Sequence, residues 1–104
     1  MMNNYTLYLG LVDKYSRLQE IATLEAFKIV ENIRKAMFCR GETFQVERVN
    51  KHDGVTFSTE EQLRIEIPNA EKTDIQNFAD ILKLAFNQEN ILVEEAEVTW
   101  EQKI

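Results

Sequence analysis

The sequence predicts an α+β protein with the ferredoxin-like βαββαβ order, in which a four-stranded antiparallel sheet carries both helices on one face. Two observations lead to this prediction. Apolar residues alternate with polar ones in four separate segments, and helical periodicity occurs in two others, in the order that two split β-α-β units require. The 104 residues suit a single domain, residues 1–104. A compact chain of this length has a radius of gyration of roughly 13 Å.

The first two elements are a strand and a helix. In residues 5–12 every second residue from Tyr5 onward is apolar and faces one side, which is the period of a strand with one face in a core. Thr23 is expected to cap a helix of about residues 23–39, whose inward face would hold Ala26, Val30, Ile33 and Met37. Gly41 supplies the C-terminal stop.

A long hairpin is predicted next. Asp53 and Gly54 separate two alternating runs, residues 43–50 and 55–68, and this dipeptide is a strong signal for a hairpin turn. The third strand is expected to end at Pro68, because proline cannot donate to a sheet ladder. The hairpin is longer than the helices beneath it require, so its tip is expected to project.

The last two elements are a helix and a strand. The segment from Thr73 to Gln76 matches a capping box and predicts a helix start. Its apolar stripe is wide enough to lie on a sheet and consists of Ile75, Phe78, Ala79, Leu82, Ala85 and Phe86. Asn87 closes this helix, and residues 91–100 are the fourth strand, with Ala96, Val98 and Trp100 on one face. A helix-rich domain is the alternative, and it requires the hairpin segment to lose its alternation.

The charge distribution argues against nucleic-acid binding. Residues 1–52 hold eight Lys/Arg and six Asp/Glu, whereas residues 53–104 hold four and twelve, which together give the net charge of −6. A nucleic-acid binder normally carries a basic stripe instead. An acidic surface of this kind suits a basic partner.

Several other classes are not expected. No apolar run approaches the roughly 20 residues of a membrane span, and Asn3 and Asn4 do not fit the start of a signal peptide, so a cytoplasmic protein is predicted. One cysteine, Cys39, allows neither an internal disulfide nor a Cys-rich zinc site, and neither a cofactor nor a metal is expected. Catalytic signatures are absent from the sequence. His52 is interpreted as an exposed turn residue and Cys39 as a half-buried structural thiol.

The face of the sheet without helices supplies the first set of candidate residues. We expect the helices to cover Leu7, Leu9, Val46, Leu63, Ile65 and Val98. The open face would then carry Tyr8 and Arg64, which suit stacking on and hydrogen bonding to a small anionic ligand such as a nucleotide. Gln45 and Gln62 would add polar contacts there. A hydrated face or a symmetric homodimer interface is the alternative.

Glutamates supply the second set, as a surface for a basic host protein: Glu60, Glu61, Glu94, Glu95 and Glu97. Along a strand Glu60 and Glu66 share one face and Glu61 takes the other, so these three do not converge. Glu95 and Glu97 are expected on the outward face of an edge strand, with Glu97 on the open face, where charge discourages unwanted pairing. A solvated face is the alternative for all of these acids.

Several stretches together carry a resemblance: the opening YTLYLGLVDK, the HDG turn, the glutamate pair before LRIEI, and the helix ending AFNQENILVEE. The chain resembles a family of small uncharacterised bacterial and phage-associated proteins over about residues 5–100. Asn90 stands where that family often has a small hydroxyl residue. The resemblance implies the ferredoxin-like fold and a phage or mobile-element origin, hence the host cytoplasm, and it implies no activity.

Three functions from different classes remain. The favoured prediction is a non-catalytic binding protein that blocks a host defence component stoichiometrically, by covering an effector protein or by sequestering a nucleotide signal. A small oligomeric enzyme is the second, in which the test substitutions are Arg64→Ala and Glu61→Gln. A structural or oligomerisation module is the third.

Overall fold

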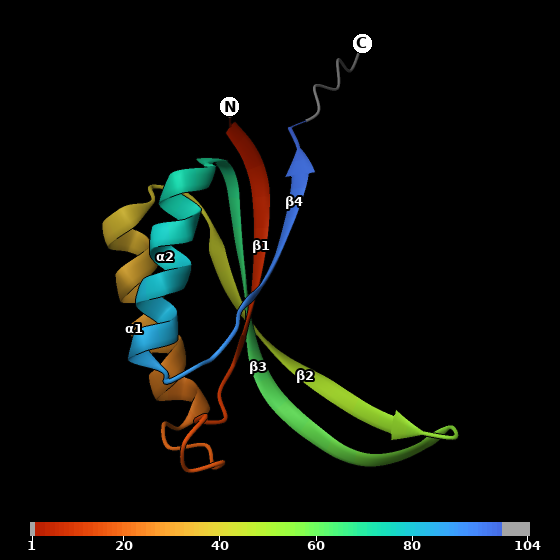
Figure 1. Cartoon of the computed structure of the whole chain (residues 1–104). Coiled ribbons are helices and arrows are strands. Elements are labelled where there is room, and N and C mark those ends of the chain that lie inside the picture. Colours follow the sequence, from red (N-terminus) through yellow and green to blue (C-terminus); the bar gives the residue numbers. More distant parts are fainter. Residues whose placement is uncertain (1, 99–104) are drawn as a thin grey trace.

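The computed structural model describes residues 2–98, apart from the side chain of Phe57. The described strands form one antiparallel sheet in the order β2-β3-β1-β4, and both helices lie on one side of it (Figure 1). The predicted ferredoxin-like α+β fold is confirmed. The elements are β1 (Met2–Gly10), α1 (Thr23–Met37), β2 (Glu42–His52), β3 (Val55–Glu71), α2 (Lys72–Ala85) and β4 (Leu92–Glu97).

The core lies between the two helices and the central strands β1 and β3. Every second residue of these strands faces the helices, and α2 contributes the stripe predicted from its sequence. The fully buried side chains with the largest volumes are Leu7, Leu9, Val30, Leu63, Ile65, Ile67, Ile75, Phe78 and Leu82. Burying a side chain of this size stabilises the fold by roughly 1.5–3 kcal/mol. Neither described helix is long and apolar enough to cross a membrane.

The starts of both helices differ from the predictions. The residue before α1 is Ala22 and the residue before α2 is Glu71, and neither start has a capping hydrogen bond from a side chain. Thr23 and Thr73 therefore lie inside the helices, and both predicted caps are wrong. The predicted end of α2 is confirmed, because Asn87 has a φ of 48°. This residue in the left-handed conformation lets the backbone N–H of Gln88 donate to the carbonyl oxygen of Lys83 at 2.9 Å, and this bond ends the helix.

An ion pair between the buried Arg34 and the half-buried Glu31 connects α1 to the start of β2. Arg34 is 6% exposed and donates from Nε and Nη2 to the carboxylate of Glu31, both at 2.9 Å. Its Nη1 donates to the carbonyl oxygen of Arg40 at 3.1 Å, and the hydroxyl of Thr43 donates to Glu31. These hydrogen bonds, above all those from Arg34, lower the pKa of Glu31 to about 2. The neighbouring Cys39 is exposed, which corrects the half-buried placement expected for it.

The β2–β3 hairpin extends well beyond the helices (Figure 1). Asp53 and Gly54 have φ values of 50° and 76°, as a two-residue hairpin turn requires, so the predicted turn is confirmed. We call residues 48–60 the arm, since β1 ends where Gly10 pairs with Gln62. The arm makes the molecule long, 47 × 34 × 21 Å, and raises its radius of gyration to 15.2 Å, above the value expected for a compact chain.

β3 continues past Pro68 to Glu71, which corrects the predicted strand end. β2 begins opposite Glu66, so the strand beyond this point has no β2 partner among the described residues, and the missing proline donor costs nothing on that side. On the other side the pairing with β1 shifts by one residue between Asn3 and Tyr5. A φ of 51° at Asn69 accompanies this bulge.

β4 is shorter than predicted and lies at the edge of the sheet. All six of its residues are exposed. Val98 follows the strand and is 40% exposed, so it is not covered by the helices as expected. The predicted positions of Thr99 and Trp100 lie outside the described residues.

Candidate ligand-binding site

Strand register defines the open face of the sheet. Directly paired residues of antiparallel strands point to the same side. Tyr8 pairs with Arg64 and Gly10 with Gln62, whereas the intervening Leu9 is fully buried beneath the helices. Tyr8, Gln62 and Arg64 therefore share the open face, as predicted.

Gln45 does not join them. It pairs with Leu63, which is fully buried, so Gln45 lies on the helix side of the sheet, where it lines a small hollow of about 210 Å³ beside Thr23. Val46 pairs with Gln62 and lies on the open face, although it was expected under the helices. Thr43 determines which residues of β2 face the helices, because its hydroxyl donates to the half-buried carboxylate of Glu31 on α1.

The open face of the sheet has a hollow at the base of the arm. This hollow has a volume of about 560 Å³ and collects side chains from β1, β2, β3, β4 and the turn after α2. Its lining consists of Tyr8, Gly10, Leu11, Val12, Arg48, Glu60, Gln62, Gln88, Asn90 and Leu92. We call it the open-face hollow. It brings Tyr8 and Gln62, from the first set of candidates, together with Glu60 from the second.

Hydrogen bonds fix one rim of the open-face hollow. The side-chain Nε2 of Gln88 donates to the carbonyl oxygen of Val12 at 2.7 Å and to that of Phe86 at 3.1 Å. Next to it, Asn87 Nδ2 donates to Asp13 Oδ2 at 2.8 Å. That bond and those from two backbone amides lower the pKa of Asp13. The loop after β1 is thus held against the turn before β4, and the two segments form a continuous wall.

Gly10 forms part of the floor of this hollow. A Cβ atom at this position would stand 3.2 Å from Oε1 of Gln88, closer than ordinary van der Waals contact. The absence of a side chain therefore keeps the space between β1 and the rim open.

Two charged side chains, Arg48 and Glu60, line the open-face hollow, and a third, Arg64, does not. Arg48 and Glu60 are directly opposite in the register and both line the hollow. Arg64 lies outside it: its guanidinium Cζ is 4.7 Å from the ring centroid of Phe44, and its Nε is 3.4 Å from Oε1 of Glu66. Arg64 was expected to meet an anionic ligand, but it does not line the hollow and Arg48 does, so Arg48 is the cation nearer to a molecule in the hollow.

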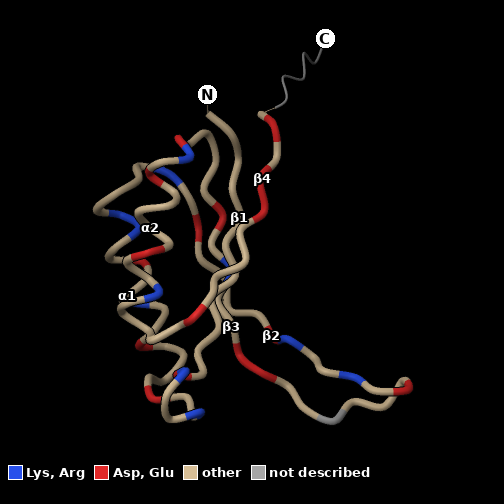
Figure 2. The backbone as a smooth tube through the Cα atoms, viewed as in Figure 1, with Lys and Arg blue, Asp and Glu red and all other residues tan. Residues whose placement is uncertain are grey.

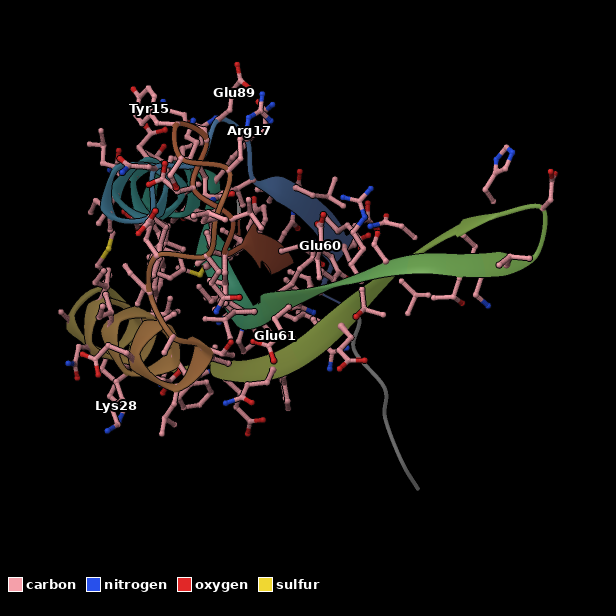
Figure 3. The ribbon with its side chains drawn as sticks, turned by 90° about the horizontal axis from the view of Figure 1, so that it is seen from below. Tyr15, Arg17, Lys28, Glu60, Glu61 and Glu89 are labelled. Atoms are coloured by element: carbon pink, nitrogen blue, oxygen red, sulfur yellow. The ribbon has the colours of Figure 1, made fainter. Side chains whose placement is uncertain are left out.

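Glu60 and Glu61 point to opposite sides of β3 (Figure 3). Glu60 shares the open face with Glu66, as predicted from the strand period. Glu61 lies on the helix side and accepts a hydrogen bond from the hydroxyl of Thr23. Only Glu60 of this pair is available to the open-face hollow.

The glutamates of β4 are also divided between the two faces. Glu94 pairs with Thr6 on the open side, whereas Glu95 pairs with Tyr5 on the helix side. Glu97 shares the side of Glu95, so its expected place on the open face is wrong. The helices do not cover β4, and these side chains remain exposed although they face the helix side.

Glu95 takes part in a small polar cluster. It accepts hydrogen bonds from the amide of Asn3 and from the hydroxyl of Tyr5, the latter at 3.1 Å. These two bonds lower the pKa of Glu95. Burial of the Tyr5 ring, together with the carboxylate of Glu95, raises the pKa of Tyr5.

A second groove, of about 600 Å³, lies between α2 and β4. It is lined by Tyr5, Ile75, Lys72, Lys83 and Glu95 among others, and it exists because α2 packs over β1 and β3 and leaves β4 uncovered. The described residues contain no group of three or more His, Cys, Asp or Glu side chains placed to hold a metal ion. The open-face hollow remains the candidate site, because it joins Tyr8, Gln62 and Glu60, which the sequence nominated, with the guanidinium of Arg48.

Sequence reasoning missed most of the lining of this site, including Arg48, Gln88 and Leu92. Arg48 could have been found from the strand period, since it shares a face with Glu60 once the hairpin register is known. Gln88 belongs to the stretch AFNQENILVEE, which carried the resemblance but indicated no role for this side chain.

No model of a protein family matches this chain, and no curated protein sequence matches it. Among solved structures it is similar to a phage SAM lyase in complex with S-methyl-5'-thioadenosine, with 20% identity, a TM-score of 0.59, and coverage of 92% of this chain and 81% of that one. A phage SAM lyase in the apo state matches with 17% identity and a TM-score of 0.57, covering 96% and 92%.

A second group of solved structures also shares the fold. The periplasmic divalent cation tolerance protein CutA from Archaeoglobus fulgidus has 11% identity and a TM-score of 0.56, with coverage of 99% of this chain and 89% of that one. At these identities the likeness concerns the fold. The chain has the ferredoxin-like fold that the phage SAM lyase and CutA structures share.

Proposed function

We propose that this protein binds S-adenosylmethionine in the open-face hollow and cleaves it, releasing S-methyl-5'-thioadenosine. The observation that carries the proposal is the shared fold with the phage SAM lyase, which extends over more than nine-tenths of this chain in both the apo and the thioadenosine-bound structure. The volume of the hollow, about 560 Å³, is in the range of small-molecule sites.

The groups in the hollow match the parts of this ligand. Tyr8 offers an aromatic face for stacking against adenine, and the amide of Gln62 offers hydrogen bonds to a base or a ribose. Glu60 supplies a carboxylate for the cationic sulfonium and ammonium groups, and Arg48 supplies a guanidinium for the ligand carboxylate. Under this proposal Tyr8 and Gln62 keep the role predicted from the sequence.

Charge favours the substrate over the product. S-adenosylmethionine has a sulfonium, an ammonium and a carboxylate group, so it is a net cation at neutral pH, whereas S-methyl-5'-thioadenosine is neutral. The protein has a net charge of −6, which draws a cationic ligand toward it. The carboxylate of Glu60 attracts the sulfonium and loses that attraction when the sulfonium is discharged, so the neutral product leaves readily.

The proposed cleavage breaks the bond between sulfur and the carbon chain of the methionine moiety. The electron pair of this bond goes to sulfur, which converts the sulfonium to the neutral thioether of S-methyl-5'-thioadenosine. As this bond breaks, an oxygen of the ligand's own carboxylate forms a bond to the same carbon, so the four-carbon amino-acid fragment leaves as its cyclic ester, the lactone, and no further reactant is needed. Apolar walls from Leu11, Val12 and Leu92 favour a step in which positive charge on sulfur is dispersed.

The biological setting is part of the same proposal. We propose that the protein is a phage or mobile-element product in the host cytoplasm that counters a defence dependent on S-adenosylmethionine. Sequestration of the compound without cleavage is the stoichiometric alternative. Blockage of a basic host protein through the acidic residues of β4 is a further alternative, because Glu94, Glu95 and Glu97 are exposed.

The test is incubation of the purified full chain with a hundredfold excess of S-adenosylmethionine, followed by chromatography with mass detection. Release of several molecules of S-methyl-5'-thioadenosine per chain supports cleavage. Binding by calorimetry without product would replace cleavage with sequestration. The absence of both binding and product would overturn the proposal.

Neighbouring glutamates provide matched variants for this assay. We expect Glu60→Gln to weaken binding of S-adenosylmethionine about tenfold, the effect of losing one charged contact in a partly exposed site. It should change binding of the neutral product much less. Glu61→Gln removes the same charge from the adjacent residue, whose side chain lies on the other face, and should leave both affinities within about twofold. Equal losses in the two variants would contradict the assignment of Glu60 to the site.

A further inference from the structure

A side-chain amide on the rim of the open-face hollow is held in one orientation. Nε2 of Gln88 donates to the carbonyl oxygens of Val12 and Phe86, at 2.7 and 3.1 Å. Carbonyl oxygens only accept hydrogen bonds, so the end of the amide that faces them must be the nitrogen. The amide cannot be turned over without losing both bonds, and Oε1 is therefore fixed as well.

The oxygen of this amide lies next to the floor of the hollow. A Cβ atom at Gly10 would stand 3.2 Å from Oε1 of Gln88, so this oxygen lies close to the backbone of β1 with no side chain of Gly10 between them. Both residues line the open-face hollow. An amide oxygen accepts hydrogen bonds and cannot donate, so the hollow has a fixed acceptor at this point.

Two other amide side chains line the hollow, Gln62 and Asn90, and neither is fixed in this way. Among the described residues neither of these side chains has a hydrogen-bond partner. Each can turn its amide and present either the oxygen or the nitrogen to a ligand. These two amides therefore accept a donor or an acceptor of the ligand equally well, whereas Gln88 accepts only a donor.

Charge indicates which part of S-adenosylmethionine lies beside Gln88. The charged residues that line the hollow, Arg48 and Glu60, belong to β2 and β3. β1 has no charged residue (Figure 2), and the lining from β4 and the turn before it is uncharged too. The charged amino-acid part of the ligand is therefore expected toward the hairpin, and the uncharged adenine toward β1 and β4. There Tyr8 and Leu92 are directly paired and offer an aromatic and an aliphatic side chain to the base.

We propose that Oε1 of Gln88 selects the base of the ligand by accepting a hydrogen bond from the exocyclic amino group of adenine. The inference rests on the proposed function for the identity of the ligand. A purine with hydrogen in place of the amino group leaves Oε1 without its donor, which weakens binding. Gly10 leaves room for the ring beside this oxygen. The role of Gln88 is base specificity, and the cleavage step does not involve it.

The experiment compares two neutral ligands by calorimetry on the purified full chain. They are S-methyl-5'-thioadenosine and its analogue with hydrogen in place of the amino group, so their difference in affinity does not depend on cleavage. We expect the wild type to bind the adenine compound about tenfold more tightly. In Gln88→Met, which has a side chain of similar length without an amide, the two affinities should agree within about twofold. A merely structural role of Gln88 in the rim would lower both affinities and keep their ratio.

Gln62→Met is the matched control, because Gln62 lines the same hollow and its amide is free to turn. This variant should weaken both ligands and keep the tenfold ratio. The comparison in the wild type needs no substitution and stands even where a variant does not fold.

Three results would overturn the inference: a wild type that binds the two compounds equally or binds neither, a ratio that survives in Gln88→Met, or a ratio that is lost in Gln62→Met instead. Failure of the proposed function is recognised separately, because it requires that S-adenosylmethionine itself neither binds nor is cleaved. A wild type that cleaves S-adenosylmethionine but binds the two compounds equally refutes the role of Gln88 alone.

Discussion

Substitution of Glu31 by glutamine tests the ion pair with Arg34 that joins α1 to β2. The side chain of glutamine has nearly the same shape but no charge, and it leaves Arg34, which is 6% exposed, without its carboxylate partner. Lowering the pKa of Glu31 from 4.5 to about 2 corresponds to about 3 kcal/mol of stability at neutral pH, since each pKa unit is worth about 1.4 kcal/mol.

The pH dependence has a defined direction. The pKa of Glu31 is depressed in the folded protein, so the ion pair contributes fully above about pH 4.5 and loses its contribution as the pH falls toward 2. The free energy of unfolding of the variant should therefore be about 3 kcal/mol lower than that of the wild type at pH 7. The difference should shrink to below about 1 kcal/mol near pH 2, where the wild-type carboxyl gains a proton.

Urea unfolding followed by circular dichroism, at one protein concentration and several pH values, measures this difference. Asp80→Asn is a matched control, because Asp80 and Lys83 have the same sequence spacing but lie at the surface with 66% and 37% exposure. That change should cost less than about 0.5 kcal/mol. A loss below about 1 kcal/mol for Glu31→Gln, or a loss that does not depend on pH, would refute the reasoning.

Two further predictions concern local geometry. Gly41→Ala should destabilise the fold by at least about 1 kcal/mol more than Gly54→Ala in the same urea assay. Both glycines have positive φ, but a Cβ at Gly41 would stand 2.7 Å from a backbone oxygen of β3, whereas Gly54 has open space around it. Equal losses of stability in the two variants would contradict this. Tyr5→Phe should raise the pKa of Glu95, measured by NMR titration of the carboxyl carbon, since the hydroxyl donates to that carboxylate; an unchanged pKa would show that the hydrogen bond is absent in solution.

The fold was predictable because its signals are local. Asp53 and Gly54 require positive φ at both turn positions, and the apolar stripe of α2 depends only on residue spacing within one helix. The end of α2 at Asn87 is equally local, since one residue must adopt the left-handed conformation there.

The wrong predictions for β2 and for the start of α1 depend on contacts between segments that lie far apart in the sequence. The alternation in β2 shows that Gln45 and Val46 face opposite ways, but only the hydroxyl of Thr43 beneath α1 decides which of them faces the helices. The predicted cap of α1 failed for a related reason: the hydroxyl of Thr23 donates to Glu61, which lies far away in the sequence.

Only part of the candidate site could be predicted from the sequence. Tyr8 and Gln62 were nominated because strand period places them on one face, and the register of β1 with β3 brings them together. The rim could not be predicted, because it depends on the bond from Gln88 to Val12, which joins the turn after α2 to the loop after β1. Such a contact has no signature in either segment alone.

The measurement that tests the proposed function most directly is product formation from S-adenosylmethionine by the purified chain. The account predicts several molecules of S-methyl-5'-thioadenosine per chain, with substrate affinity reduced in Glu60→Gln and retained in Glu61→Gln. A chain that neither binds S-adenosylmethionine nor forms the thioadenosine product would contradict it.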